Sequence, residues 1–216
     1  MTIDEMRVVL GLDASVPDDE VVQAYVIYLE GLPQAAEPLS LTEAKAQLGI
    51  LDNSEDARIT GLIIAAREYA ENYTGLVLTA RPVTQTFDTF GNWLDIDRGP
   101  VRAITSVTYY DADGEVQTLE ESGYTARLGR TPVRIVPSVG SSWPQTQWAP
   151  GVVEVTYDAG YALPEQVPQA IKQAMLLMIR HWFDNSSAVI AGTSAAAVEM
   201  PLGVAALLDG YRVRTV

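Results

Sequence analysis

The spacing of apolar residues changes twice along this chain, and these changes constrain the fold more than any other feature of the sequence. Between residues 40 and 75 apolar positions recur every three to four residues, as on one face of a helix. From about 77 to 158 they alternate or form short β-branched and aromatic runs, which is typical of strands. Helical spacing returns at 165–184 and at 201–210. The pattern predicts an α+β fold in which an antiparallel β module, residues 77–158, is inserted into a helical core.

Capping residues mark the ends of the first two core helices. Ser40 and Glu43 have the spacing of a capping box, so we expect a helix over 40–49. The longest amphipathic stretch of the first half predicts a second helix over 54–74, and Gly75 is suited to end it in a left-handed conformation.

The helix expected at 165–184 is apolar on more than one face. A helix that is apolar most of the way round is buried on two sides. A neighbouring subunit could cover the second side, which makes Met175, Met178 and Trp182 candidate contacts between subunits.

Four stretches of the β module have the composition of strands, and one turn signal joins strands into a hairpin. Asp113-Gly114 lies between Tyr110 and Val116, which predicts a β-hairpin at this point. The four expected strands are 83–90, 103–110, 132–136 and 152–157.

Residues 1–38 are expected to form an acidic extension, with short helices within 2–31 followed by a proline-containing linker, and 39–216 to form one domain. The extension holds eight acidic side chains and one arginine, which is half of the chain's net charge of −14. Phosphate binding depends on clustered lysine and arginine, so a protein this acidic is poorly suited to gripping DNA. Acids stand where an export signal needs bases, and no apolar run approaches the length of a membrane span.

Known catalytic and metal-binding patterns are not found in the sequence. There is no cysteine and one histidine, His181, so a zinc site cannot be assembled from these ligands. Asp111 to Glu115 resembles the start of a calcium loop, but flanking strands favour a hairpin turn. The alternative that remains from the enzyme class is a metal-assisted hydrolase that uses Asp95, Asp97 and Asp111. We expect no enzymatic activity and no cofactor.

Two tryptophans, Trp143 and Trp148, lie in a loop rich in glycine, serine and proline. Loop tryptophans either fold back on the subunit's own sheet or act as anchors in a partner's pocket. Both readings stay open from the sequence, so these residues are candidate contacts to neighbouring subunits or other proteins.

The C-terminal helix has the same ambiguity. Leu207, Leu208 and Tyr211 form an apolar stripe, and Arg212 and Arg214 give the terminus a charge opposite to that of the rest of the chain. This helix, which follows a weakly patterned stretch at 186–200, either completes the subunit's own core or docks on a partner. If it docks, residues 186–216 are expected to be loosely held in the free protein and to become ordered against that partner.

Two sets of residues have an informative order and spacing along the chain. The first set is Leu39-Ser40-Leu41-Thr42-Glu43-Ala44-Lys45, Leu48, Asp56, Ile63-Ile64-Ala65-Ala66-Arg67 and Glu71-Asn72-Tyr73-Thr74-Gly75. The second comprises Arg98-Gly99-Pro100-Val101, Ser106-Val107, Tyr109, Trp143-Pro144, Ala159-Gly160-Tyr161, Val167-Pro168, Ile171-Lys172-Gln173-Ala174, Leu202-Gly203-Val204, Leu207-Leu208 and Tyr211-Arg212. The first set resembles the opening of the phage head–tail connector proteins, also called adaptor or head-completion proteins. The second set is similar to the long form of that family, which carries a β insertion.

The resemblance implies a structural role in a virion or gene transfer agent, after assembly in the host cytoplasm. Such proteins form a ring, usually a dodecamer, beneath the portal protein, and DNA passes through the ring without sequence-specific binding. A downstream neck or tail-completion protein binds to the ring. In this setting the C-terminal stripe and arginines are candidate portal contacts. A different neck or tail-completion protein is the alternative within the same class.

Overall fold

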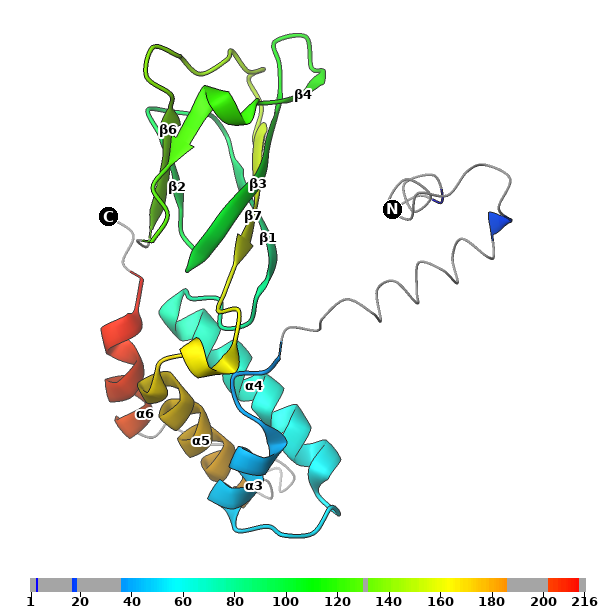
Figure 1. Ribbon diagram of the computed structural model, residues 1–216, viewed down its shortest axis with the longest axis vertical. Helices are drawn as coiled ribbons and strands as arrows, with labels where there is room; N and C mark the ends of the chain where they lie inside the picture. The colour runs from blue at the N-terminus through cyan, green and yellow to red at the C-terminus, as the bar shows by residue number, and fades with distance from the viewer. Residues whose placement is uncertain (1–2, 4–16, 19–35, 130–131, 186–201, 214–216) are drawn as a thin grey trace, which may run out of the picture. The chain divides into compact units, whose positions relative to one another are not determined.

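The computed structural model describes residues 3, 17–18, 36–129, 132–185 and 202–213 (Figure 1). The chain divides into two compact units, Met1–Ala36 and Glu37–Val216. Apart from residues 3, 17 and 18, the helices expected within 2–31 lie outside the described residues, and the division at residue 38 stays a prediction. The description below concerns the second unit.

The helical core contains the helices that the sequence predicts, with boundaries shifted by a few residues. They are α3 (Leu41–Leu48), α4 (Asp56–Thr74), α5 (Gln169–Asp184) and α6 (Leu202–Leu208), and α5 contacts the other three. The start of α5 is later than expected because Pro164–Gln166 forms a separate 3₁₀ turn, η2. One continuous hydrophobic cluster joins all four helices, as predicted.

The predicted caps of the first two helices are confirmed. The Ser40 hydroxyl accepts a hydrogen bond from the Glu43 N–H, and the Glu43 carboxylate accepts one from the Ser40 N–H at 2.7 Å. Gly75 ends α4 with φ of 77°, a left-handed conformation that favours glycine. These caps fix where α3 begins and where the chain leaves α4 toward the β module.

The β module contains two antiparallel sheets. The larger has the strand order β1-β7-β3-β4 and the smaller β2-β6-β5. Strands β1, β3, β6 and β7 correspond to the four predicted stretches, and pairing of Tyr110 with Val116 confirms the predicted hairpin. The bounds are β1 Arg81–Phe87, β2 Leu94–Ile96, β3 Val101–Tyr110, β4 Val116–Thr118, β5 Tyr124–Ala126, β6 Val133–Pro137 and β7 Val153–Ala159.

The two sheets share a second hydrophobic cluster, separate from that of the helices. Strand β7 shows the alternation that a half-buried strand requires, because Val153, Val155 and Tyr157 are fully buried and the residues between them are not. The smaller sheet contributes Leu94, Ile96, Val133 and Ile135 to the same cluster. The outer faces of the two sheets therefore point away from each other.

A buried carboxylate joins the helical core to the first strand. Both oxygens of Glu71 on α4 accept hydrogen bonds from Arg81 on β1, at 3.0 and 2.7 Å, and Oε1 also accepts from the Leu78 N–H at 2.7 Å. Arg67 adds a contact at 3.4 Å. Burial alone would raise the pKa of Glu71, but these hydrogen bonds and positive charges outweigh it and hold the pKa below its ordinary value.

Gly160 lies where strand β7 returns to the helical core. Its φ is +102°, and a Cβ at this position would be 2.3 Å from the carbonyl oxygen of Thr79. Its N–H donates to the Pro100 carbonyl at 2.9 Å. Only glycine fits this close approach of two backbone segments.

Candidate interaction surfaces

Helix α6 completes the subunit's own core. Val204 and Leu208 are fully buried in the helical cluster, and Leu207 is partly buried against it. Leu208, a candidate portal contact from the sequence, is therefore not available to a partner. The buried stripe of α6 matches the alternative left open above, in which this helix finishes the fold.

The residues after α6 lie against the end of α4. The Val213 N–H donates to the Thr74 carbonyl at 2.7 Å, and the Tyr73 hydroxyl donates to Asp209 Oδ1 at 2.6 Å, which raises the pKa of Tyr73. The Arg212 guanidinium lies 5.7 Å from the centre of the Tyr73 ring.

The expectation that the whole stretch 186–216 is loosely held is wrong for 202–213, because that part packs on the core. Tyr211 and Arg212 remain exposed on it. Arg214 and the stretch at 186–200 lie outside the described residues.

The second apolar side of α5 is covered within the subunit. Met175 and Met178 are fully buried in the helical cluster, together with Leu208 of α6. Trp182 is partly buried and meets Tyr69 of α4 edge to face at 6.3 Å. The two methionines therefore have no surface for a neighbour, since α3, α4 and α6 already surround this helix. Of the three candidates on α5, only Trp182 keeps an exposed part.

The two loop tryptophans have different environments. Trp143 stacks on Phe90 with 4.7 Å between ring centres and belongs to the β cluster, so it is folded back on the sheets. Trp148 is fully exposed, at 103% of its reference area. It borders a hollow of about 460 Å³ formed with Asp88 and neighbouring loop residues. Trp148 is thus the tryptophan of this loop that a partner can reach.

The three carboxylates of the hydrolase alternative have separate local roles. Asp95 forms an ion pair with Arg134 at 2.8 Å, and Asp97 is hydrogen-bonded by the Gln85 side chain. Asp111 accepts hydrogen bonds inside the hairpin turn, which lowers its pKa. Within the part of the chain that the structure describes, no three acidic or histidine side chains are grouped to hold a metal ion. The hydrolase alternative requires these three carboxylates to converge on one point, and they do not.

The outer face of the smaller sheet carries an arginine cluster that the sequence reasoning missed. Arg134 lies over the Trp93 ring at 4.1 Å, and Arg127 is exposed nearby. With Val136 and the fully exposed Val139, the two arginines line a hollow of about 370 Å³. Alternation of buried Val133 and Ile135 with Arg134 and Val136 was the available signal. It could not be used without the pairing of β5, β6 and β2.

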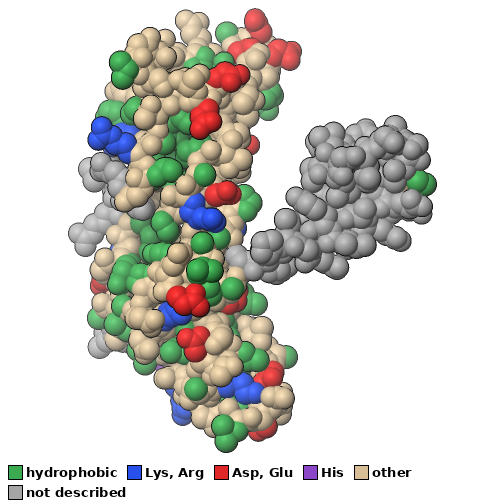
Figure 2. All heavy atoms as spheres, viewed as in Figure 1, with side chains coloured by type: hydrophobic (Ala, Val, Ile, Leu, Met, Phe, Trp, Pro, Cys, Tyr) green, Lys and Arg blue, Asp and Glu red, His purple; other side chains and the backbone are tan. Residues whose placement is uncertain are grey.

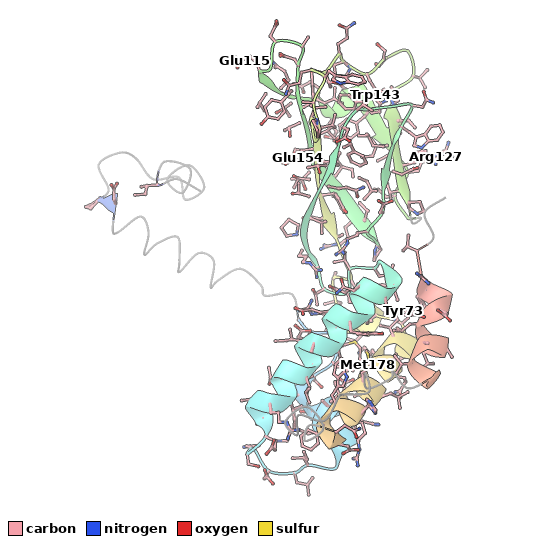
Figure 3. The ribbon with its side chains drawn as sticks, turned by 180° about the vertical axis from the view of Figure 1, so that it is seen from behind. Tyr73, Glu115, Arg127, Trp143, Glu154 and Met178 are labelled. Atoms are coloured by element: carbon pink, nitrogen blue, oxygen red, sulfur yellow. The ribbon has the colours of Figure 1, made fainter. Side chains whose placement is uncertain are left out.

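The outer face of the larger sheet has the opposite character. Across the middle of this face, Thr84 of β1 lies beside Thr156 of β7, and Thr86 lies beside Glu154. The residues paired at these positions include no lysine or arginine. Glu154 and Glu115 lie on this side of the module, as Figure 3 shows. A face of hydroxyl and carboxylate groups offers phosphates no cationic partner.

A family model described as head completion protein matches residues 37–213. The chain belongs to this family. The match begins where the second compact unit begins, so residues 1–36 lie outside what head completion proteins of this model share.

Solved structures of similar fold come from gene transfer agent (GTA) particles. A chain from the neck of an empty GTA particle computed with C6 symmetry has a TM-score of 0.66 and 24% identity, covering 85% of this chain and 95% of that one. A chain from the neck of a native GTA particle computed with C12 symmetry has a TM-score of 0.64 at 24% identity, covering 85% and 94%. A chain from the virion of a native GTA particle has a TM-score of 0.63 and 23% identity, covering 85% of this chain and 95% of that one. At this identity the likeness shows the fold.

No curated protein sequence matches this head completion protein. Among the described residues, no helix combines the length and apolar character needed to cross a membrane.

Proposed function

We propose that this head completion protein is a neck subunit of a phage-like particle, present as a ring beneath the portal. The ring joins the DNA-filled head to the tail and extends the DNA channel. The observation that carries this proposal is the family match over 37–213, supported by a fold shared with chains from the necks of GTA particles. The role is structural, without catalysis or a cofactor, and the place of the protein is the virion after assembly in the host cytoplasm.

The charge of the chain suits a channel through which DNA moves. Tight phosphate binding needs clustered cations, because affinity comes from neutralised phosphates and released counterions. This chain has a net charge of −14, so duplex DNA gains little by binding to it. A net negative charge of this size therefore favours passage of DNA without sequence-specific binding.

The exposed residues around the C-terminus are the proposed portal contact. Tyr211 and Arg212 are accessible, Leu207 is partly so, and Arg214 follows in the sequence. Guanidinium groups pair well with carboxylates on a partner. The exposed Trp148, in the loop between β6 and β7, is the proposed anchor for a downstream neck protein.

The proposal is tested by removing the chain from a particle-producing strain and restoring it from a plasmid. We expect DNA-filled heads without tails when the chain is absent, and complete particles when it returns. A restored Arg212→Glu variant should fold normally and enter particles poorly. Glu165→Arg, a charge reversal of the same size and opposite sign at an exposed site, should behave like the wild type. Normal particles without the chain would contradict the proposal. Copurification with tails rather than heads would favour a tail-completion role.

A further inference from the structure

The β3–β4 hairpin ends in a surface that is both apolar and acidic. We call Tyr110, Asp113, Glu115 and Val116 the hairpin end. Tyr110 and Val116 are cross-strand partners, yet they are 42% and 61% exposed. The Asp111 carboxylate accepts hydrogen bonds from the N–H groups of residues 113 and 115, both at 3.0 Å. The backbone of the turn is therefore held in one conformation, and the exposed side chains of Asp113 and Glu115 project from it.

The outer face of the smaller sheet has the complementary chemistry. We call Arg127, Arg134, Val136 and Val139 the arginine face, and they line the hollow of about 370 Å³. Arg134 is fixed by Asp95 and Trp93. Arg127 makes no hydrogen bond or ion pair with any residue in the described ranges. Val139 is fully exposed, so the arginine face combines cations with uncovered apolar area.

These two surfaces lie on different sides of the β module. Their sheets pack face to face, and Figure 3 shows Glu115 and Arg127 on opposite sides with Trp143 between them. Figure 2 likewise shows acidic side chains gathered at the β3–β4 end and basic side chains on the β2–β6 flank. A single subunit therefore cannot bring its own hairpin end onto its own arginine face.

We propose that the hairpin end of one copy docks on the arginine face of the next copy. The carboxylates of Asp113 and Glu115 pair with the guanidinium groups, and Tyr110 and Val116 cover Val136 and Val139. Because the two surfaces differ, the contact is head-to-tail, and repeated rotation closes it into a ring. Charge complementarity also sets the register and excludes hairpin-to-hairpin contacts. The inference rests on the proposed neck ring and adds which surfaces join its subunits.

Charge reversal tests the pairing within particles. Glu115→Arg and Arg127→Glu alone should each lower the copies of this chain per particle by at least about tenfold, since like charges then face each other. The two changes in one chain should restore incorporation. Glu165→Arg is the matched control and should have no effect. Equal loss in the double variant and in either single variant would overturn the pairing.

Crosslinking tests the contact directly, because the natural chain contains no cysteine. Particles are assembled with Asp113→Cys and Val139→Cys in one chain and treated with a short bismaleimide. We expect a ladder of dimers, trimers and larger species, whereas each single variant should give no ladder. Incorporation into the neck without a ladder would overturn this inference alone. Absence of the wild-type chain from particle necks would instead overturn the proposed function.

Discussion

Replacing Glu71 with glutamine should weaken the connection between the helical core and the β module. Glu71 is 3% exposed, and its carboxylate accepts two hydrogen bonds from Arg81 and one from the Leu78 N–H. Removing one partner of a buried ion pair costs roughly 3–5 kcal/mol. The Arg81 side chain is 34% exposed and can partly return to water, so the lower end applies. We expect Glu71→Gln to lower the free energy of unfolding by about 3 kcal/mol.

The loss should depend on pH in a defined direction. The pKa of Glu71 in the folded protein lies below its ordinary value, so its contribution to stability is fully present above that ordinary value. The contribution is lost as the pH falls through the folded pKa. The difference in stability between the wild type and Glu71→Gln should therefore be largest near neutral pH and shrink below about pH 4.

Urea unfolding followed by far-UV circular dichroism measures both effects. A loss of about 3 kcal/mol moves the urea midpoint down by roughly 1 M or more at the slope of a protein this size. Glu68→Gln is the control. The Glu68 side chain is 61% exposed, and its ion pair with Arg67 is long, at 3.8 Å. It should change stability by less than about 1 kcal/mol. Equal costs for the two variants, or a cost for Glu71→Gln that is constant from pH 7 to pH 3, would refute the reasoning.

Three further substitutions test the packing. Gly160→Ala should prevent stable folding, seen as loss of a cooperative thermal transition, because the new methyl group meets the Thr79 carbonyl. Leu208→Ala should cost about 2–5 kcal/mol in urea unfolding, since it opens a cavity in the core. A wild-type midpoint would show that α6 is not part of that core. Trp143→Ala should destabilise by about 3–5 kcal/mol, whereas exposed Trp148→Ala should stay within about 0.5 kcal/mol. Equal effects of the two tryptophans would contradict their different placement.

Local signals in the sequence were sufficient for most of the fold. The capping box at Ser40 and the glycine at 75 act within a few residues, so they could be read before any tertiary contact was known. The turn at Asp113-Gly114 is equally local. Strand β5 was missed because its three residues are too few to establish an alternating pattern.

The interaction surfaces depend on contacts that are distant in sequence. Apolar residues on more than one face of α5 indicate that the helix is covered, but they do not show by what. In the structure α3, α4 and α6 of the same subunit contact α5, and Met178 is buried in the cluster that they share. The arginine face needs β2, β5 and β6 side by side. Glu71 and Arg81 are ten residues apart, and their ion pair forms only because the end of α4 lies against the start of β1.

Electron cryomicroscopy of the neck of particles that contain this chain tests the central claim most directly. We expect a closed ring of copies between the portal and the first tail component, with a continuous central channel. The helical core and β module of Glu37–Val216 should fit the density of each subunit without rearrangement. Density for this chain only in the tail tube or the capsid shell, or complete particles with no copy of it in the neck, would contradict the account.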